Sequence, residues 1–209
     1  MKSRIIHRDE DVAEGAIWLA ENEPRFAYAL SLTGPLPLRR REAGFAALLN
    51  AIVGQQVSVA SADAIWRRLE QASLTLRENV AIASEVDLRS CGLSRQKINY
   101  ALALANSGVD YEALTELSDQ DVVKILIKIK GIGAWTAEVY TMFSLGRSDV
   151  FAPGDLALQE AARDLFALEA RPNEKELRQM ALAWSPWQAV AARALWSYYR
   201  VMKNREGIS

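Results

Sequence analysis

Two glycines, one residue apart, interrupt a stretch that otherwise has the apolar periodicity of helices. They are Gly131 and Gly133, within KIKGIGAWTAEVY at residues 128–140. Glycine adopts backbone angles that side chains forbid, and it allows another surface to come close. The amides after such a turn begin a helix and lack an intrahelical acceptor, so they can bind an anion such as phosphate. A tight corner between two helices with no ligand would use the same residues.

A second candidate for chemistry is the carboxylate that follows the next loop. Asp155 comes directly after Pro153 and Gly154 and begins an apolar-periodic segment. From its position alone it is an N-cap, because aspartate is favoured where a helix begins. The helix dipole also stabilises negative charge at this end. The residues alone therefore indicate a capping role for Asp155.

The counts of two residue types exclude several classes of site. The chain of 209 residues has one cysteine, Cys91, and one histidine, His7. It cannot by itself form a disulfide framework, a cysteine-ligated iron–sulfur cluster or a tetrahedral zinc site. Histidine-based catalysis is also disfavoured, because His7 lies near the terminus. Carboxylates, hydroxyls, aromatic rings and the backbone remain as functional groups.

The overall charge does not by itself suggest a nucleic-acid-binding protein. The formal net charge is −1 and the pI is about 6.0, whereas such domains usually carry a basic surplus. The basic residues are clustered, however, at 39–41, at 67–68 and in the segment 124–130 ahead of the glycines. Each cluster could equally be a solvated helix face. Local charge therefore leaves nucleic-acid binding open.

No segment of the sequence has the pattern of a membrane span or a signal peptide. No apolar run approaches the length that crosses a bilayer. The first residues, MKSRIIHRDEDVAEG, bring in acids before any apolar stretch can build. We therefore expect a cytoplasmic protein with no membrane partner, associated with the nucleoid if it is bacterial.

The periodicity of apolar residues predicts an all-α fold. Apolar residues recur with the 3.6-residue period of helices, and the alternation typical of strands is nearly absent. Prolines at positions 24, 35 and 37 break the first third of the chain into a short helix and a loop. Helices are predicted in the segments 43–54, 57–70, 94–108, 118–129, 134–146, 156–168, 173–184 and 186–203.

The glycine segment resembles the helix-hairpin-helix motif of DNA repair glycosylases, whose core reads L-P-G-[IV]-G-x-x-T-A. The matching residues are Gly131, Ile132, Gly133, Thr136 and Ala137, and Lys130 stands where the family usually has proline. In that family an aspartate follows a Gly/Pro-rich loop about twenty residues after the hairpin. Asp155 is in that place, which favours a catalytic role over a purely capping one.

Three more segments resemble one branch of this superfamily, 3-methyladenine DNA glycosylase II. They are AIVGQQVSVASA at 51–62, CGLSRQKINYALALA at 91–105 and PWQAVAARALW at 186–196. With the hairpin and the aspartate loop, the similarity runs in consistent order from about residue 43 to 200. Five ordered motifs are far more specific than one.

The resemblance implies a role for Asp155 and for a base pocket. Asp155 would stabilise the oxocarbenium-like transition state of N-glycosidic cleavage, activate the attacking water, or both. Trp135 and Trp196 match the two tryptophans that line the family's pocket for the flipped base. Val139 stands where the family has a tyrosine, with Tyr140 beside it, so one wall of the pocket is altered. The expected substrates are alkylated purines such as 3-methyladenine and 7-methylguanine.

The resemblance also implies DNA contacts and a bound cation. Gln56 occupies the position of the residue that fills the gap left by the flipped nucleotide. The DNA-binding residues expected on this basis are Gln56, Ser58, Lys130, Gly131, Gly133, Ala134 and Thr136. Gln55 and Ser58 could instead serve helix packing or phosphate contact. The carbonyls of Ile127, Ile129 and Ile132 would hold a structural Na⁺ or K⁺, and no other cofactor is required.

The position of Trp135 predicts the reaction type. Bifunctional members of the superfamily, such as endonuclease III, place a lysine nucleophile two residues after the second glycine. Here that residue is Trp135, so no Schiff base can form at that site. The absence of a cysteine quartet also disfavours the branches that carry an iron–sulfur cluster. We expect a hydrolase without lyase activity.

The resemblance implies two helical lobes that flank a cleft, built from one unit of residues 1–209. The middle lobe is expected at about 52–145, with the hairpin at 127–136, and the second lobe at 1–51 plus 146–209. The family enzyme also carries an N-terminal β-rich domain. Too few residues precede Ala43 to build one, so we expect a compact form. It should act as a monomer on double-stranded DNA that contains alkylated bases.

Two other functions stay open from the sequence. The first is a non-catalytic helix-hairpin-helix module that binds DNA through its backbone amides. Such a module would need neither the carboxylate of Asp155 nor an aromatic pocket. The second is a glycosylase for uracil, for other deaminated bases or for oxidised bases. A neutral base would require specific hydrogen-bond partners, and no clear candidate stands at the pocket positions.

Overall fold

Helices form nearly all the regular structure of residues 1–206, the part of the chain that the computed structural model describes. Within this part there are twelve α-helices and two short 3₁₀ helices. Strand-like pairing in the described residues is limited to an isolated antiparallel bridge between Ile5 and Arg147. The predicted all-α class is therefore confirmed. None of the described helices combines the length and the apolar character that a membrane crossing requires.

The chain divides into two compact units. The central unit is Arg41–Tyr140, and the terminal unit combines Met1–Arg40 with the chain from Thr141 onward. The middle lobe was predicted at about 52–145. The structure also assigns residues 41–51 to this central unit and ends it at Tyr140. The second boundary falls within one helix, α9 (Ala134–Phe143).

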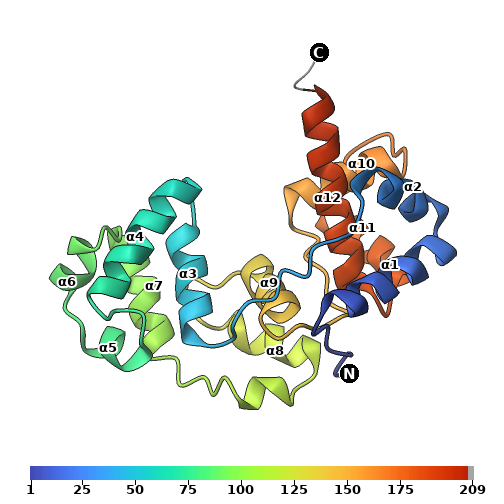
Figure 1. Ribbon diagram of the computed structural model, residues 1–209. Coiled ribbons are helices and arrows are strands. Elements are labelled where there is room, and N and C mark those ends of the chain that lie inside the picture. Colours follow the sequence, from blue (N-terminus) through green and yellow to red (C-terminus); the bar gives the residue numbers. More distant parts are fainter. Residues whose placement is uncertain (207–209) are drawn as a thin grey trace. The chain divides into compact units, whose positions relative to one another are not determined.

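The central unit is built around the pairing of α3 with α7, and α4 also packs on α3 (Figure 1). The two short helices α5 and α6 contact α7. Besides the start of α9, its helices are α3 (Phe45–Gly54), α4 (Val59–Gln71), α5 (Arg77–Ile82), α6 (Glu85–Ser90), α7 (Arg95–Ala105), η1 (Ala113–Thr115) and α8 (Asp119–Leu126). The fully buried residues of these two helices include Leu48 and Ile52 on α3 and Ala101 and Leu104 on α7.

Local side-chain caps define where the central helices begin. The Ser94 hydroxyl accepts from the amide of Lys97 at the start of α7, at 3.3 Å. The Ser118 hydroxyl accepts from the amide of Asp121 at the start of α8, at 3.2 Å. Such caps satisfy amides that have no intrahelical acceptor. Both caps confirm the predicted helix starts.

Buried polar groups fasten α7 and the loop before it. Lys97 is 9% exposed, and its Nζ donates to the carbonyl of Val53 at 2.7 Å, close to the end of α3. Burial lowers the pKa of Lys97. Cys91 is 4% exposed, with its Sγ 3.7 Å from the carbonyl oxygen of Arg68. A cation near a helix C-terminus is favoured by the helix dipole, so Lys97 stabilises the end of α3.

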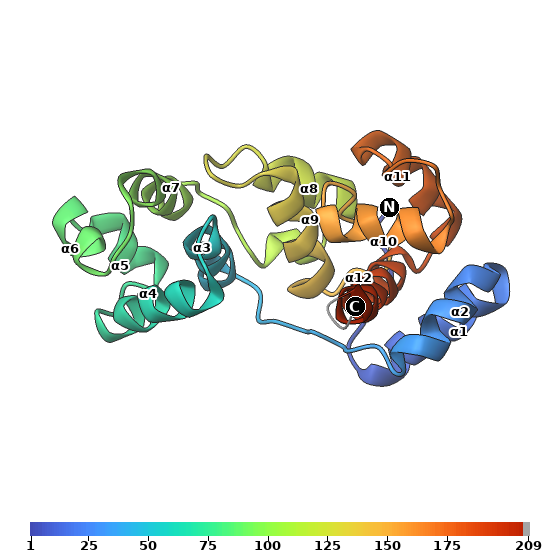
Figure 2. The same ribbon diagram turned by 90° about the horizontal axis from the view of Figure 1, so that it is seen from above.

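The terminal unit surrounds its long last helix, α12 (Gln188–Glu206), which contacts α10, α2 and α1 (Figure 2). The other helices of this unit are α1 (Asp9–Asn22), α2 (Pro24–Thr33), α10 (Leu156–Leu165), α11 (Glu174–Ala181) and η2 (Leu182–Trp184). Trp184 is 3% exposed and packs edge-on against Phe26 and Phe151 at centroid distances of 5.3 Å. Asn173 and Glu176 form a capping box at the start of α11.

One prediction about the first third of the chain was wrong in part. The prolines at 24, 35 and 37 were expected to leave one short helix and a loop. The loop is present at residues 34–44, but two regular helices, α1 and α2, come before it. Pro24 is the first residue of α2, where its fixed φ suits a helix and its missing N–H is not needed. The Glu23 carboxylate accepts from the amide of Arg25 and completes the cap.

A buried arginine on α12 holds the segment that follows α2. Arg193, fully buried on α12, donates to the carbonyl of Leu38 at 2.9 and 3.2 Å and to that of Ala189 at 2.8 Å. Its guanidinium carbon lies 4.7 Å from the centroid of the Phe143 ring. Burial lowers the pKa of Arg193. These contacts fix the backbone next to Arg39 and Arg40.

Candidate base-excision site

The two glycines form a tight hairpin between α8 and α9. After α8, the amides of Lys128 and Ile129 donate to the carbonyls of Ile125 and Leu126 at 3.3 and 3.0 Å. The amide of Ile132 then donates to the carbonyl of Ile129 at 3.0 Å, which closes the turn. Helix α9 begins at Ala134. The predicted helix-hairpin-helix at 127–136 is therefore present.

The two glycines serve different purposes. Gly131 has a φ of +96°, and a Cβ there would lie 2.3 Å from Cγ of Tyr100, so the fold itself needs glycine at this position. Gly133 is exposed, and a Cβ built on it would meet no other atom within 4 Å. The second glycine thus leaves open space in front of the amides that start α9. This is the free approach that an anion would need.

The hairpin is anchored by its apolar side chains. Ile132 is 4% exposed and Ile129 is 6% exposed, so both side chains fix the turn in the core. Lys130 and Ala134 are exposed next to the glycines. Thr136 is only 7% exposed, so its side chain serves the packing of α9 more than the surface.

A polar groove of about 400 Å³ adjoins the hairpin in the central unit. Gln55 lines this groove, and its side-chain amide donates to the carbonyl of Gly131 at 2.9 Å. Gln56 is exposed and has a φ of +55°. The residues around the groove are Gln55, Gln56, Ser94, Gln96, Lys97, Tyr100 and Gly131–Gly133. Gln56, the residue predicted to fill the gap left by a flipped nucleotide, therefore lies at the same groove as the hairpin glycines.

Ser58 has a structural role in the chain. Its hydroxyl accepts from the amide of Ser61 at 3.2 Å and caps α4. It also contacts the hydroxyl of Ser61 at 3.0 Å. Of the two uses that the sequence left open for Ser58, helix packing is the one with contacts in the structure.

The first residues of α9 carry the pocket candidates of the central unit. Trp135 is 45% exposed, an unusual state for an indole in a folded protein. Val139 is half-buried. Tyr140 is 4% exposed, and its hydroxyl accepts from the amide of Gly44 at 2.9 Å. Burial raises the pKa of Tyr140. Trp135 thus presents its ring to the surface, whereas Tyr140 braces the backbone before α3.

Asp155 is the N-cap of α10 in the terminal unit. Its Oδ1 accepts from the amide of Ala157 at 2.9 Å and from that of Leu158 at 3.1 Å. Its own amide donates to the carbonyl of Ala152 at 3.0 Å. The predicted cap is confirmed. Two hydrogen bonds and the helix dipole hold an anion in one orientation at the start of α10.

The loop ahead of Asp155 is rigid for identifiable reasons. Phe151 and Ala152 are buried. The side-chain amide of Gln159 donates to the carbonyl of Pro153 at 2.8 Å. Further back, the amide of Ser148 donates to the carbonyl of Arg4 at 2.9 Å, which ties the loop to the first residues of the chain. These contacts set the position from which the carboxylate projects.

Trp196 lies on α12 in the same unit and is half-buried. Its ring packs on that of Phe143, with centroids 5.7 Å apart and planes tilted by 34°. The guanidinium carbon of Arg39 lies over the indole at 6.0 Å from its centroid. The sequence indicated the Arg39–Arg41 cluster only as a charged patch. No local pattern connects Arg39 to a ring 157 positions away.

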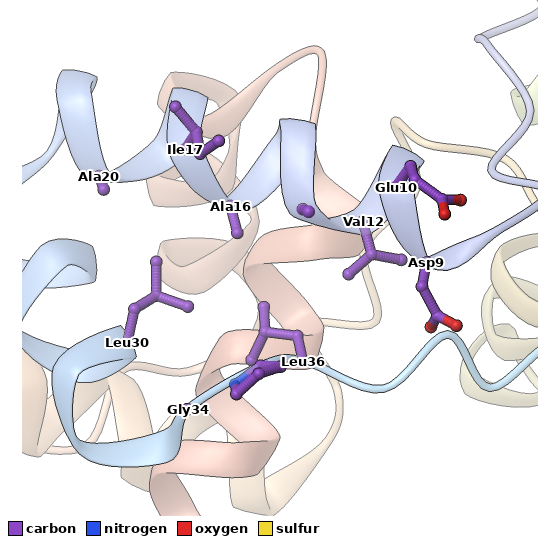
Figure 3. A pocket seen from close by; sticks show the side chains of 11 residues that line it. Asp9, Glu10, Val12, Ala16, Ile17, Ala20, Leu30, Gly34 and Leu36 are labelled. Carbon is purple, nitrogen blue, oxygen red and sulfur yellow. The ribbon is translucent and has the colours of Figure 1, made fainter.

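A larger hollow in the terminal unit contains none of the predicted site residues. It has a volume of about 600 Å³ and lies between α1, the end of α2 and the segment that follows (Figure 3). Its lining is mostly apolar, with Val12, Ile17 and Leu30 among the contributors. Figure 3 shows Asp9 and Glu10 together at one end. Size alone therefore does not locate the catalytic site.

The described residues contain no group of three or more His, Cys, Asp or Glu side chains that could hold a metal ion. The hairpin offers main-chain oxygens instead. The carbonyls of Ile127 and Ile129 are at the end of α8, where the helix dipole favours a cation. That of Ile129 already accepts one amide, and a carbonyl has a second lone pair. With Ile132, these neutral oxygens suit a weakly bound monovalent ion.

Comparison with known families decides the identity of this fold. The model of the HhH-GPD superfamily of base excision DNA repair proteins matches residues 49–187. The chain belongs to this superfamily. The match includes the hairpin and the Asp155 loop and ends just before α12, so Trp135 and Asp155 lie inside it and Trp196 lies outside it.

Several proteins with solved structures resemble this HhH-GPD chain closely. One is a DNA-3-methyladenine glycosidase from Bacillus halodurans, with a TM-score of 0.81, 31% identity, and coverage of 98% of this chain and 95% of that one. Another is the 3-methyladenine DNA glycosylase of Schizosaccharomyces pombe in complex with abasic DNA. Its TM-score is 0.75, with 27% identity and coverage of 88% and 95%.

A curated relative of this HhH-GPD chain is the DNA-3-methyladenine glycosylase of Bacillus subtilis, 28% identical over 169 residues. The aligned region covers 73% of this chain and 56% of that protein. The chain thus spans little more than half of this relative but nearly all of both solved chains.

Proposed function

We propose that this protein is a monofunctional DNA glycosylase that removes alkylated purines, including 3-methyladenine and 7-methylguanine, in base excision repair. The observation that carries the proposal is the orientation of Asp155. Two amides of α10 hold its carboxylate in a chain that belongs to a base excision repair superfamily. A carboxylate in that setting is the group that cleavage of an N-glycosidic bond requires.

The reaction is hydrolysis of the bond between the base and deoxyribose. As this bond breaks, positive charge develops on the sugar in an oxocarbenium-like transition state. The oriented anion of Asp155 stabilises that charge without having to reorganise. It also orients the water that attacks the sugar carbon and accepts the proton that the water loses. The products are the free base and an abasic site.

The indole rings suit a damaged base that carries positive charge. Methylation at N3 of adenine or N7 of guanine leaves the base cationic, and cations are attracted to indole faces by about 0.5–2 kcal/mol. Trp135 is 45% exposed and offers such a face on α9. Trp196 offers the second on α12. Alkylation also weakens the glycosidic bond, so modest catalysis is sufficient.

The hairpin supports binding to duplex DNA of any sequence. The amides that begin α9, behind the open position at Gly133, receive a phosphate, and the exposed ammonium of Lys130 adds attraction. A Na⁺ or K⁺ held by the carbonyls of Ile127, Ile129 and Ile132 would add positive charge close to the same phosphate. Gln56 enters the DNA duplex from the exposed loop after α3 and occupies the space that the flipped nucleotide vacates.

Trp135 supports the absence of lyase activity. An amine nucleophile at this position would form a Schiff base with the sugar and cleave the strand. An indole cannot do so. The strand should therefore remain intact after base release until the abasic site is cleaved by heat or by another enzyme. We propose that the enzyme acts as a monomer in the cytoplasm.

The test is release of free bases from methylated duplex DNA, resolved by chromatography. The wild-type protein should release 3-methyladenine and 7-methylguanine, and Asp155→Asn should lower release by at least about a hundredfold, the scale of a lost electrostatic stabiliser. Affinity for the duplex should stay within about twofold. Binding without release of any base would favour the non-catalytic DNA-binding module. Release of uracil or an oxidised base alone would favour the other glycosylase class.

A further inference from the structure

The loop that carries Gln56 is held at two points by groups from elsewhere in the central unit. Lys97, on α7, donates to the carbonyl of Val53 at 2.7 Å. Gln55 donates from its side-chain amide to the carbonyl of Gly131 at 2.9 Å, across 76 positions of sequence. The first contact fixes the end of α3, and the second joins the loop directly to the hairpin.

Gln56 itself adopts a backbone conformation that needs such support. Its φ of +55° is in the left-handed region, which residues other than glycine seldom adopt. Conformations of this kind persist where the surrounding structure determines them. Gln55, with a φ of −61°, is the residue immediately before it and ends α3. The anchoring of the Gln55 side chain therefore restricts the direction in which Gln56 projects.

The acceptor of this hydrogen bond is also fixed. Gly131 has a φ of +96°, and the ring of Tyr100 lies against it closely enough to exclude a Cβ. The Tyr100 hydroxyl accepts from the side-chain amide of Gln96 at 2.5 Å. The carbonyl that Gln55 reaches thus belongs to the most constrained residue of the hairpin, and it is two residues from the open position at Gly133.

We propose that Gln55 is a positioning residue for base flipping. It couples the hairpin, which binds the phosphate, to Gln56, the residue that enters the DNA duplex. Through the 2.9 Å bond to Gly131, the distance between a bound phosphate and the inserted side chain becomes constant. The insertion is then aimed at one nucleotide relative to the gripped phosphate. This inference rests on the proposed function, in which Gln56 fills the space of the flipped nucleotide.

The first test measures flipping without chemistry. A duplex containing 2-aminopurine next to a damaged or abasic position becomes more fluorescent when its bases unstack. In the Asp155→Asn background, Gln55→Ala should lower the enhancement at saturating protein, and the flipping equilibrium should fall about two- to tenfold, the worth of one neutral hydrogen bond. Affinity for undamaged duplex should change by less than about twofold. Gln71→Ala, at an exposed residue that ends α4, is the matched control.

A double-mutant cycle tests whether Gln55 acts through Gln56. If it does, Gln56→Ala removes the benefit of the anchor, and adding Gln55→Ala should produce no further loss of flipping. Two independent losses that multiply would overturn the positioning role. An equal loss of affinity for undamaged DNA would also overturn it, because it would indicate a general defect of the hairpin.

The variant Gln55→Glu supplies a readout that a general packing role would not move. The introduced carboxylate accepts but does not donate, so it repels the carbonyl of Gly131 at neutral pH. Once protonated, the same carboxyl donates a hydrogen bond. The flipping defect relative to wild type should therefore shrink as the pH falls toward about 5. A defect that is constant with pH would contradict the proposal. Base release by the wild-type protein is measured separately, so a failure of the glycosylase assignment is distinguishable.

Discussion

The guanidinium of Arg39 lies over the indole ring of Trp196, 6.0 Å from its centroid. Arg39 belongs to a segment whose backbone is clamped at Leu38 by two hydrogen bonds from Arg193, and its own φ is +54°. The indole ring of Trp196, which would attract a cationic base in the proposed function, thus already has a cation over it. In the proposed function, a positively charged base would have to compete with Arg39 for this ring.

Removal of Arg39 should therefore favour cationic substrates over neutral ones. We expect Arg39→Ala to raise the ratio of 7-methylguanine release to hypoxanthine release about two- to fivefold, the worth of an exposed cation–π contact. Single-turnover excision rates on duplexes with one defined lesion give this ratio. Arg41→Ala, at an exposed arginine two positions further along the chain, is the control for loss of general DNA attraction. A ratio unchanged between wild type and Arg39→Ala would contradict this assignment.

The capping role of Asp155 and its proposed catalytic role can be separated by the choice of substitution. Asparagine is as good an N-cap as aspartate, whereas alanine costs about 1 kcal/mol of stability at such a position. We therefore expect Asp155→Asn to lose base release while unfolding at nearly the wild-type denaturant midpoint. Asp155→Ala should lose both activity and stability.

Urea titrations followed by circular dichroism, run beside the base-release assay, measure both quantities. If Asp155→Asn retained full release, the carboxylate would have no catalytic role. If it unfolded as early as Asp155→Ala, the two hydrogen bonds from Ala157 and Leu158 would not be the cap that the distances of 2.9 and 3.1 Å indicate.

The two hairpin glycines should respond differently to substitution. Gly131→Ala places a Cβ against Tyr100 in a left-handed conformation, so we expect a loss of about 1–3 kcal/mol of stability. Gly133→Asp meets no atom in the fold but puts a negative charge in front of the helix amides. It should keep the wild-type stability and bind every duplex more weakly.

Fluorescence anisotropy with undamaged duplexes of two unrelated sequences checks the second part, over a range of salt concentrations. The expected result is an equal loss of affinity on both sequences and a smaller salt dependence. If Gly133→Asp bound DNA with unchanged affinity, the hairpin would not be part of the DNA-binding surface.

The first residues of the chain should make stability depend on pH in the acid range. The amides of His7 and Arg8 and the guanidinium of Arg4 donate to the carboxylate of Asp11, which lowers its pKa below the ordinary 3.8. A carboxyl with a depressed folded pKa contributes stability above its unfolded pKa and loses it as pH falls through the folded one. The free energy of unfolding should therefore decline below about pH 3.8.

Asp11→Asn should flatten this decline and cost about 1.5 kcal/mol at neutral pH, the scale of hydrogen bonds to a charged group. Urea unfolding at a series of pH values from 7 to 2.5 measures both effects, with the exposed Asp9→Asn as the control. An identical pH profile in wild type and Asp11→Asn would show that the network around Asp11 contributes nothing.

Features that depend on neighbours in sequence were predictable. The caps at Ser94, Ser118 and Asn173, the buried Ile132 and the cap at Asp155 all follow from residue types within one or two turns. Their physical basis is local hydrogen bonding and apolar periodicity. The same local reasoning missed that Pro24 starts a second helix, because proline is tolerated in the first turn of a helix.

Features that depend on contacts between distant residues were not predictable. The Gln55–Gly131 bond joins positions 76 residues apart, and the Arg193–Leu38 bonds join positions 155 apart. A glutamine or an arginine carries no signal of its partner, because either can equally point into solvent. The assignments that came from family resemblance, such as Trp196, located the ring but not Arg39 beside it.

The single cysteine has a practical consequence. Cys91 is 4% exposed, so its thiol is shielded from reagents in the folded protein. A cysteine introduced on the surface, for example by Gln71→Cys, would become the dominant site for maleimide dyes or nitroxide spin labels. The natural chain can therefore be converted into a spectroscopic probe by one substitution, with the native thiol left in place.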